Sequence, residues 1–221
     1  MARWPALVIA GGLLVTVACG GPTARPAPQS AVCFDLRAYF TNDGISWNKD
    51  RFDGNFDTVQ NPHGSTYPAE EFPAANTVQP VLGLPGLLMA IPPTADDALN
   101  NLACDGQILN AFVPQRFDRL YFVGSATMGA QSGRIGLRYR DGTTAEVALE
   151  MPDWCRPPAD LGTREVCAFS HRHDYRGADE PVRCALFAVP VPLDGTRFLE
   201  AIQLPRNANI HLFALTALVA R

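Results

Sequence analysis

Acidic and amide side chains make the segment between residues 42 and 57 rich in oxygen ligands. The segment contains Asn42, Asp43, Asp50, Asp53, Asn55 and Asp57. Hard cations such as calcium prefer ligands of this kind. The spacing is not that of an EF-hand, because neither Gly44 nor Gly54 has a carboxylate at the first ligand position of such a loop. We therefore expect these side chains to cap turns in a long loop. A structural calcium bound by Asn42, Asp43 and Asp53 is the alternative, and no other cofactor is expected.

Two histidines, His171 and His173, are followed directly by Asp174 and lie between Cys167 and Cys184. Residues at i and i+2 share one face of a strand, so the pair could bind zinc together with a thiolate. Oxidising surroundings would instead draw the thiols into disulfides, and the neighbouring arginines repel a cation. The sequence therefore favours a solvated loop here over a zinc site.

Catalytic side chains do not form a recognisable set. Glu70 and Glu71 are adjacent and indicate a solvated turn, whereas Asp153 follows a strand, where a carboxylate usually accepts bonds from turn N–H groups. The sequence contains no G-x-S-x-G elbow, no H-E-x-x-H motif and no glycine-rich phosphate loop. His211 lies in an apolar run and is expected to be a hydrogen-bonded core histidine. We therefore expect that the protein is not an enzyme.

Sugar binding requires less than catalysis. An exposed aromatic face contacts the apolar side of a pyranose ring, and a few fixed polar groups surround it. Trp47 in the long loop, Tyr67, and the pair Arg172 and Tyr175 are candidates for such contacts. Packing in the core is the competing interpretation, in particular for Tyr67 and Trp154.

The first residues are typical of an export signal. Arg3 provides a positive flank, and residues 6–18 form an apolar stretch of signal-peptide length that is too short to span a bilayer. The stretch ends in Val-Thr-Val-Ala before Cys19, which resembles the lipobox of bacterial lipoproteins. That resemblance implies a lipid-modified Cys19 and an extracytoplasmic protein held at the cell membrane by its lipid anchor alone. An ordinary signal peptide that releases a soluble protein is the alternative.

The expected organisation is a lipoprotein signal peptide at 1–18, a lipid-attached Pro/Gly-rich tether at 19–32 and one folded domain at 33–221. A chain of 221 residues is long enough for one well-formed core. Its 47% hydrophobic and 18% charged residues indicate a globular protein. The net charge is −4 and the basic residues are scattered singly, so we expect no nucleic-acid partner.

Five cysteines remain in the domain: Cys33, Cys104, Cys155, Cys167 and Cys184. Outside the cytoplasm they are expected to be oxidised where geometry permits. At most two bridges can form, and many pairings are open. Because the last three cluster late in the chain, we expect at least one bridge to join two of them, without preference for a particular pair.

Period-two alternation dominates the middle of the domain. Ile135, Leu137 and Tyr139 point one way and arginines point the other, and after Asp141-Gly142 the segment 144–151 alternates in the same manner. Asp-Gly is a favoured dipeptide of tight hairpin turns. This pattern predicts a hairpin with one buried face and one face in water.

The segments 120–123, 185–189 and 210–215 are apolar on both faces, as central strands are. Pro190 and Pro192 are expected to end the second of them. Short strands between turn residues, with one helix candidate near residues 68–72, predict an all-β fold, a jelly-roll-like antiparallel β-sandwich.

Several segments in a fixed order carry a family resemblance. They are residues 39–46 (YFTNDGIS), 52–54 (FDG), 65–70 (STYPAE), 100–107 (NNLACDGQ), 120–127 (LYFVGSAT), 153–154 (DW) and 211–215 (HLFAL). The set resembles accessory modules of actinobacterial exo-acting glycoside hydrolases, including α-mannosidases, which are similar to galactose-binding-domain jelly rolls and carbohydrate-binding modules. The resemblance implies a galactose-binding-like sandwich over about residues 33–219 and a role in carbohydrate binding.

The leading hypothesis is therefore a surface-tethered, non-catalytic module that binds a glycan or cell-surface polysaccharide. It rests on fold and resemblance. A structural or protein-interaction lipoprotein without a sugar site is the first alternative. A small glycoside hydrolase that uses the loop carboxylates is the second.

Overall fold

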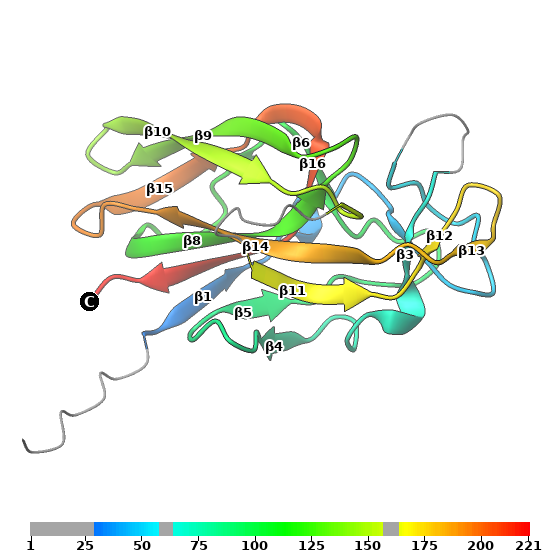
Figure 1. Cartoon of the computed structure of the whole chain (residues 1–221). Helices are drawn as coiled ribbons and strands as arrows, with labels where there is room; N and C mark the ends of the chain where they lie inside the picture. Colours follow the sequence, from blue (N-terminus) through cyan, green and yellow to red (C-terminus); the bar gives the residue numbers. More distant parts are fainter. Residues whose placement is uncertain (1–28, 58–63, 157–163) are drawn as a thin grey trace, which may run out of the picture.

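The computed structural model describes residues 29–57, 64–156 and 164–221 (Figure 1). The expected signal peptide, Cys19 and most of the tether lie outside these residues. Within the described part of the chain, no helix has the length and apolarity needed to cross a membrane.

The described chain is all-β, as the alternation predicts, with 53% of residues in strands and 3% in helix. The elements in chain order are β1 (Ala31–Phe34), η1 (Arg37–Tyr39), β2 (Ile45–Ser46), β3 (Tyr67–Pro68), η2 (Ala69–Glu71), β4 (Val78–Pro80), β5 (Leu88–Ala90), β6 (Leu102–Asp105), β7 (Ile108–Leu109), β8 (Gln115–Ala126), β9 (Gln131–Tyr139), β10 (Thr144–Met151), β11 (Arg164–Phe169), β12 (Arg172–His173), β13 (Asp179–Glu180), β14 (Cys184–Pro192), β15 (Phe198–Gln203) and β16 (Arg206–Val219). The helix candidate near 68–72 is the single 3-10 turn η2. A second such turn, η1, was not predicted from the sequence.

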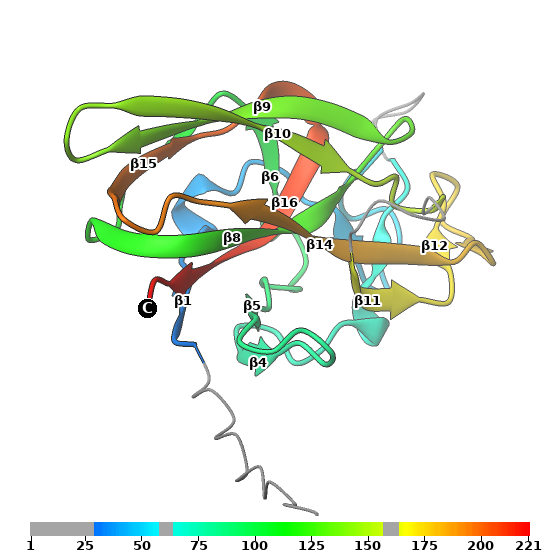
Figure 2. The same ribbon diagram turned by 60° about the vertical axis from the view of Figure 1, so that its left-hand side comes forward.

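Two antiparallel layers form the sandwich (Figures 1 and 2). One layer contains β1, β16, β8, β14 and β11 side by side, and the other contains β10, β9, β15 and β7. β8 takes part in both, because its first residues pair with β15 and the rest of the strand pairs with β14 and β16. The predicted antiparallel β-sandwich is confirmed.

The hairpin of β9 and β10 is confirmed with its predicted faces. Ile135, Leu137 and Tyr139 are buried, and Leu149 and Met151 are buried on the partner strand. The turn differs from the expected two-residue form. Gly142 has a φ of +83° and Asp141 does not have a positive φ, and Tyr139 N–H bonds to the Thr143 carbonyl. A three-residue loop with one left-handed glycine therefore closes the hairpin.

The apolar runs at 120–123, 185–189 and 210–215 form the centres of β8, β14 and β16, as expected. β14 does not end at Pro190, however, because Pro190 and Pro192 pair with residues of β8. β11 pairs with β14 only up to Ala188. Beyond that residue β14 is an edge strand in the described structure, and an edge strand tolerates a missing N–H donor.

Two apolar clusters pack on opposite sides of the layer that contains β8. One fills the space between the two layers and includes Phe122, Leu137 and Leu215. The other lies under the segment 64–91, which includes η2, β4 and β5, and is rich in aromatic rings. Its rings belong to Phe56, Tyr67, Phe72, Trp154, Phe169 and Phe213.

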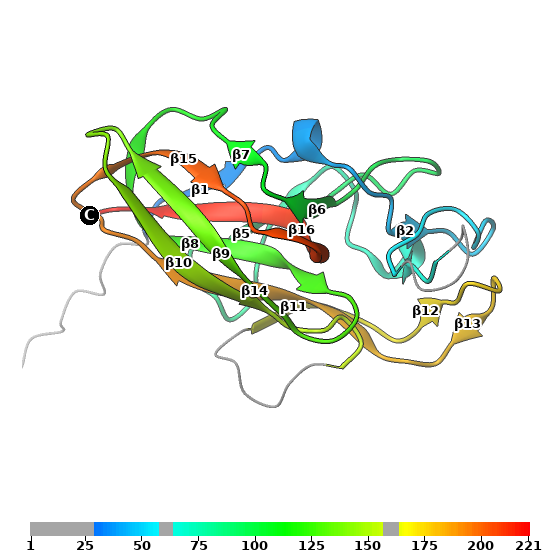
Figure 3. The same cartoon turned by 90° about the horizontal axis from the view of Figure 1, so that it is seen from above.

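The two ends of the sandwich differ. β1 begins where β16 ends, with Ala31 paired to Leu218, so the chain enters and leaves the fold at one end. Figures 1 and 3 show β12 and β13 at the opposite end, where the connections are long, and Figure 3 also shows β2 there. We call this opposite end, built from residues 41–57, 64–71, 94–101 and 171–180, the loop end.

Candidate functional site

Short backbone pairings connect the four segments of the loop end. β2 pairs in parallel with β3, and Thr66 forms a bridge with His173. Asn42 forms a bridge with Asn101 at the start of β6. Segments far apart in the sequence are thereby held side by side at the edge of the aromatic core.

An acidic hollow lies on this end. It is lined by Thr41, Asn42, Asp43, Asp50, Phe52, Asp53, Gly54, Asn55 and Asp97. Both carboxylate oxygens of Asp53 accept a bond from the Asp97 N–H, at 3.1 and 3.0 Å. The Asp43 carbonyl accepts the Asn55 N–H at 2.6 Å. A Cβ at Gly54, whose φ is +81°, would lie 2.9 Å from that carbonyl oxygen, so the loop needs glycine there.

Each carboxylate of the hollow makes ionisation of its neighbours less favourable. Burial raises the pKa of Asp43 to about 7, and the nearby Asp53 and Asp97 carboxylates add to the increase. Burial also raises the pKa of Asp53, with further contributions from Asp97, Asp96 and Asp50. Clustered carboxylates whose pKa values are raised in this way favour a bound cation or hydrogen-bond donor in the hollow.

A chain of amide side chains connects this hollow to the core. Asn100 donates from Nδ2 to Asp43 and accepts the Gly44 N–H at 2.9 Å. Asn101 donates to the Asn100 side-chain oxygen at 2.9 Å, and its own oxygen lies 2.8 Å from His211 Nδ1. Burial lowers the pKa of His211 to about 4, so the ring is neutral near pH 7 and donates from Nδ1. The expected hydrogen-bonded core histidine is present, and Asn100 and Asn101 position Asp43.

The predicted calcium ligands lie in one region. Asn42, Asp43 and Asp53 all line the hollow, together with Asp50 and Asp97. The Asn42 amide nitrogen donates to the Asn101 side chain at 3.2 Å. Asp57 lies elsewhere, because its carboxylate accepts the Ser65 N–H at 2.7 Å. The carboxylates present fit the oxygen chemistry that calcium requires.

Two of the predicted aromatic contacts are located differently from expectation. Tyr67 is 0% exposed, and its hydroxyl donates to the Ala185 carbonyl at 2.9 Å, so the prediction of a ligand contact is wrong for this residue. Burial on all sides by the aromatic core is the physical reason. Trp47 is partly buried against that core, and its indole N–H donates to the Thr94 carbonyl.

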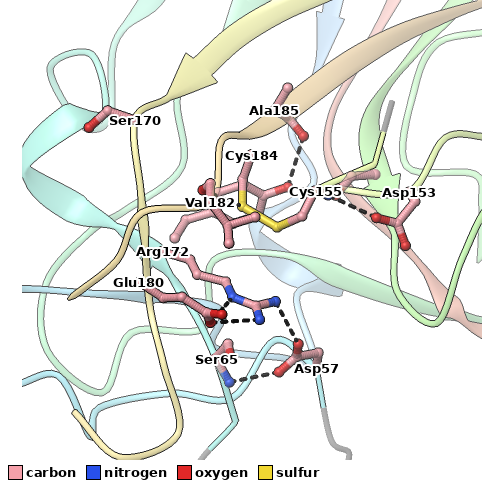
Figure 4. The surroundings of a disulfide bond; sticks show 12 residues. Asp57, Ser65, Asp153, Cys155, Ser170, Arg172, Glu180, Val182, Cys184 and Ala185 are labelled. Atoms are coloured by element: carbon pink, nitrogen blue, oxygen red, sulfur yellow. Dashed lines mark hydrogen bonds and ion pairs between the residues drawn. A yellow bond between two sulfur atoms is a disulfide. The ribbon is translucent and has the colours of Figure 1, made fainter. Parts of the chain in front are cut away.

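Arg172 and Tyr175 do not form a pair. The Arg172 guanidinium contacts Glu180 at 2.7 Å and Asp57 at 3.6 Å (Figure 4). It also lies over the Trp154 ring. Tyr175 is 45% exposed, and the guanidinium of Arg176 lies 5.3 Å from its ring centre. Arg172 therefore holds segments of the loop end together, whereas Tyr175 presents a ring to solvent.

Phe52 is a further residue of the hollow, which the sequence did not indicate as a site residue. It lines the acidic hollow and is 50% exposed. A Cβ on Gly177 would lie 2.8 Å from the Phe52 ring, so the ring packs over the turn between β12 and β13. Its position directly before Asp53-Gly54 could have indicated a site residue, but a phenylalanine is more often part of the core.

The expectation of a solvated loop is wrong at the two histidines, whereas Glu71 lies in the turn η2 with a partly exposed side chain. His173 is 0% exposed, and His171 is partly buried against Glu71, which also accepts bonds from Ser170. Asp174 is not beside the histidine rings. It accepts the N–H groups of its own turn, including that of Ala178 at 2.9 Å. Asp153 also accepts turn N–H groups, at Gly129 and Cys155, as expected.

One disulfide is present among the described cysteines, between Cys155 and Cys184 (Figure 4). It confirms the expected bridge within the late cluster. Cys33, Cys104 and Cys167 are free. Neither Cys167 nor Cys184 provides the thiolate partner considered for the histidines, because Cys184 is in the disulfide and Cys167 lies in β11, against Met89.

The fold and this end together define a β-sandwich module with polar and aromatic loops gathered on one side. The chain belongs to the family of AziU2-like beta-sandwich domains, whose model matches residues 30–221. A search of curated proteins finds no match.

Proposed function

We propose that the protein is a non-catalytic, extracytoplasmic binding module that recognises a glycan at the acidic hollow. The observation that carries the proposal is the exposed ring of Phe52 among the carboxylates of Asp43, Asp53 and Asp97. An aromatic face binds the apolar side of a pyranose, and carboxylate oxygens accept hydrogen bonds from its hydroxyl groups. Tyr175, on the turn that also packs against Phe52, adds a second exposed ring nearby.

The similarity of the motifs to galactose-binding-like modules of glycoside hydrolases supports this proposal as an analogy of fold. The lipobox-like sequence at Cys19 supports attachment to the cell membrane through lipid. We therefore propose a galactose-binding-like module, attached to the membrane through lipid, with a cell-surface polysaccharide as its ligand.

We also propose that the acidic hollow can bind a calcium ion. The mutual repulsion that raises the pKa of Asp43 would be relieved by a divalent cation, which favours the ionised carboxylates. A sugar could then bind directly to the carboxylates or to the cation. Measurements with and without calcium separate these two modes.

A glycan array probed with labelled protein tests the proposal, once with calcium and once with a chelator. We expect binding to a restricted set of glycans and a loss of about tenfold or more in affinity for Phe52→Ala. Phe198→Ala is the matched control, because Phe198 is an exposed ring on β15, outside the loop end. If the protein binds no glycan either with calcium or with chelator, the proposal is wrong, and the hypothesis of a protein-interaction lipoprotein takes its place.

A small glycoside hydrolase is the second candidate. Asp43, with its pKa raised to about 7, lies near Asp53, and a protonated carboxyl beside an ionised one is the arrangement used for general acid catalysis. Release of aryl glycosides that Asp43→Asn abolishes would favour the enzyme. An equal rate for the variant and the parent would leave binding as the function.

A further inference from the structure

We propose that His171, His173 and Asp179 form a binding site for a transition-metal ion of the zinc class. The three residues each offer one ligand atom, and these atoms lie within 4.8 Å of one another. Oδ1 of Asp179 lies 3.8 Å from Nε2 of His171 and 3.7 Å from Nε2 of His173. The site is separate from the acidic hollow and does not depend on the proposed glycan.

The unpartnered nitrogens are the main evidence. Within the described structure, Nε2 of His171 and Nε2 of His173 are both buried and have no hydrogen-bond partner. His173 is completely buried. A buried polar atom without a partner is costly, so such atoms need an explanation. Two of them that converge on one carboxylate oxygen are explained by a metal ion between the three atoms.

The other ring nitrogens set the required tautomer. Nδ1 of His171 lies 3.1 Å from a Glu71 carboxylate oxygen, and Nδ1 of His173 lies 2.7 Å from the Ser46 hydroxyl. In the tautomer with Nδ1–H, each ring donates a hydrogen bond to that oxygen, and the lone pair on Nε2 is free to bind a metal. Metal-binding histidines typically have an outer hydrogen bond of this kind to a carboxylate or other oxygen.

The ligand chemistry selects the type of ion. Two imidazoles and one carboxylate suit zinc and its neighbours, whereas calcium and magnesium require oxygen ligands. In a tetrahedral zinc site with bonds of about 2.0 Å, ligand atoms are about 3.3 Å apart. Because Asp179 Oδ1 is already within 3.8 Å of both nitrogens, the main change needed is a rotation of the two imidazole rings that brings their Nε2 atoms closer together. A water molecule would occupy the fourth position.

Arg51 is the cation already beside Asp179. Its guanidinium lies 3.0 Å from Oδ1 and 3.1 Å from Oδ2, and it also contacts Asn48 at 2.7 Å. A carboxylate can bind a metal through one oxygen and accept a hydrogen bond at the other. With the metal on Oδ1, Arg51 gives up its contact with that oxygen and keeps its hydrogen bonds to Oδ2 and to Asn48, so the two cations share Asp179.

The position of the site indicates a structural role. β12 and β13 contain two residues each, and they carry His173 and Asp179 opposite one another. A two-stranded hairpin of this length has little stability of its own. A metal that joins both strands to His171 would fix the turn on which Phe52 packs.

Equilibrium dialysis of the purified protein against zinc sulfate, with metal analysis of the retained fraction, tests the inference. We expect one zinc per chain at this site, a loss for His171→Ala and for Asp179→Asn, and a 10- to 100-fold weaker affinity for Glu71→Gln. Glu146→Gln, an exposed carboxylate on β10, is the matched control and should bind as the parent does. Thermal unfolding of each variant without metal separates lost binding from lost folding.

Cobalt substitution distinguishes the histidine site from the free cysteines. Cobalt bound by two imidazoles and a carboxylate gives visible d–d bands without a sulfur-to-cobalt charge-transfer band. Zinc retention that is unchanged in both His171→Ala and Asp179→Asn would overturn the inference. A strong sulfur charge-transfer band, or no retained zinc, would overturn it equally.

Discussion

Replacing Asp43 by asparagine removes a carboxylate whose ionised form destabilises the folded protein. The asparagine side chain keeps an oxygen that can accept the bond from Asn100. An increase in pKa from 3.8 to about 7 corresponds to an upper limit of about 4 kcal/mol. Because Asp43 is only partly buried, solvent screening reduces this to about 1–2 kcal/mol.

The sign of the effect follows from proton linkage. Between pH about 4 and 7, folded Asp43 holds a proton that the unfolded chain releases. Its contribution to stability is therefore complete below about pH 4 and is lost as the pH rises through about 7. We expect Asp43→Asn to match the parent near pH 4 and to be more stable by about 1–2 kcal/mol at pH 8, an increase in Tm of about 2–8 °C.

Thermal unfolding in chelator, with parent and variant compared at each pH, measures this difference. The comparison is needed because His211, whose pKa burial lowers to about 4, makes stability fall as the pH decreases below 6.5. Asp141→Asn is the control of opposite sign, because hydrogen bonds from Thr143 lower the pKa of Asp141. A variant at Asp43 that is less stable than the parent at pH 8 would refute the electrostatic reasoning.

Three further predictions concern the sandwich itself. Gly124→Ala would place Cβ 2.0 Å from the His211 carbonyl oxygen, so we expect insoluble protein or a large decrease in Tm. Reduction of the disulfide, which joins cysteines 29 residues apart, should lower the free energy of unfolding by about 3–4 kcal/mol in denaturant titrations. Tyr67→Phe removes a buried hydroxyl with two partners and should cost about 1–3 kcal/mol in the same assay, without any change in glycan binding.

Period-two alternation was sufficient to predict the β9–β10 hairpin, and continuous apolar runs were sufficient to predict the central strands, because burial of one or both faces leaves a direct mark on the sequence. Features that depend on pairing were less accessible. The prolines of β14 were expected to end a strand, and they are tolerated because β11 does not extend beside them. The sequence does not show which edge of a strand is unpaired.

The site residues show the same limit. The oxygen-rich segment was recognised and its members do line one hollow, but Phe52 and Asp97 belong to it only through the folding of separate loops. Tyr67 was one candidate for a surface contact, and it is instead buried in the aromatic core. For His171 and His173, the nearby sequence suggested Asp174 or a thiolate. The strand register instead places Asp179 opposite His173.

Because both chain termini leave the sandwich at the same end, its attachment has a direction. If the protein is attached to a surface through its first residues, β1 and the end of β16 face that surface and the loop end faces away from it. Phe52 and the carboxylates around it would then be the parts farthest from the anchoring surface and the first to meet a large polymer. A fusion partner at either terminus would therefore not cover the loop end or block the binding of a polymer there.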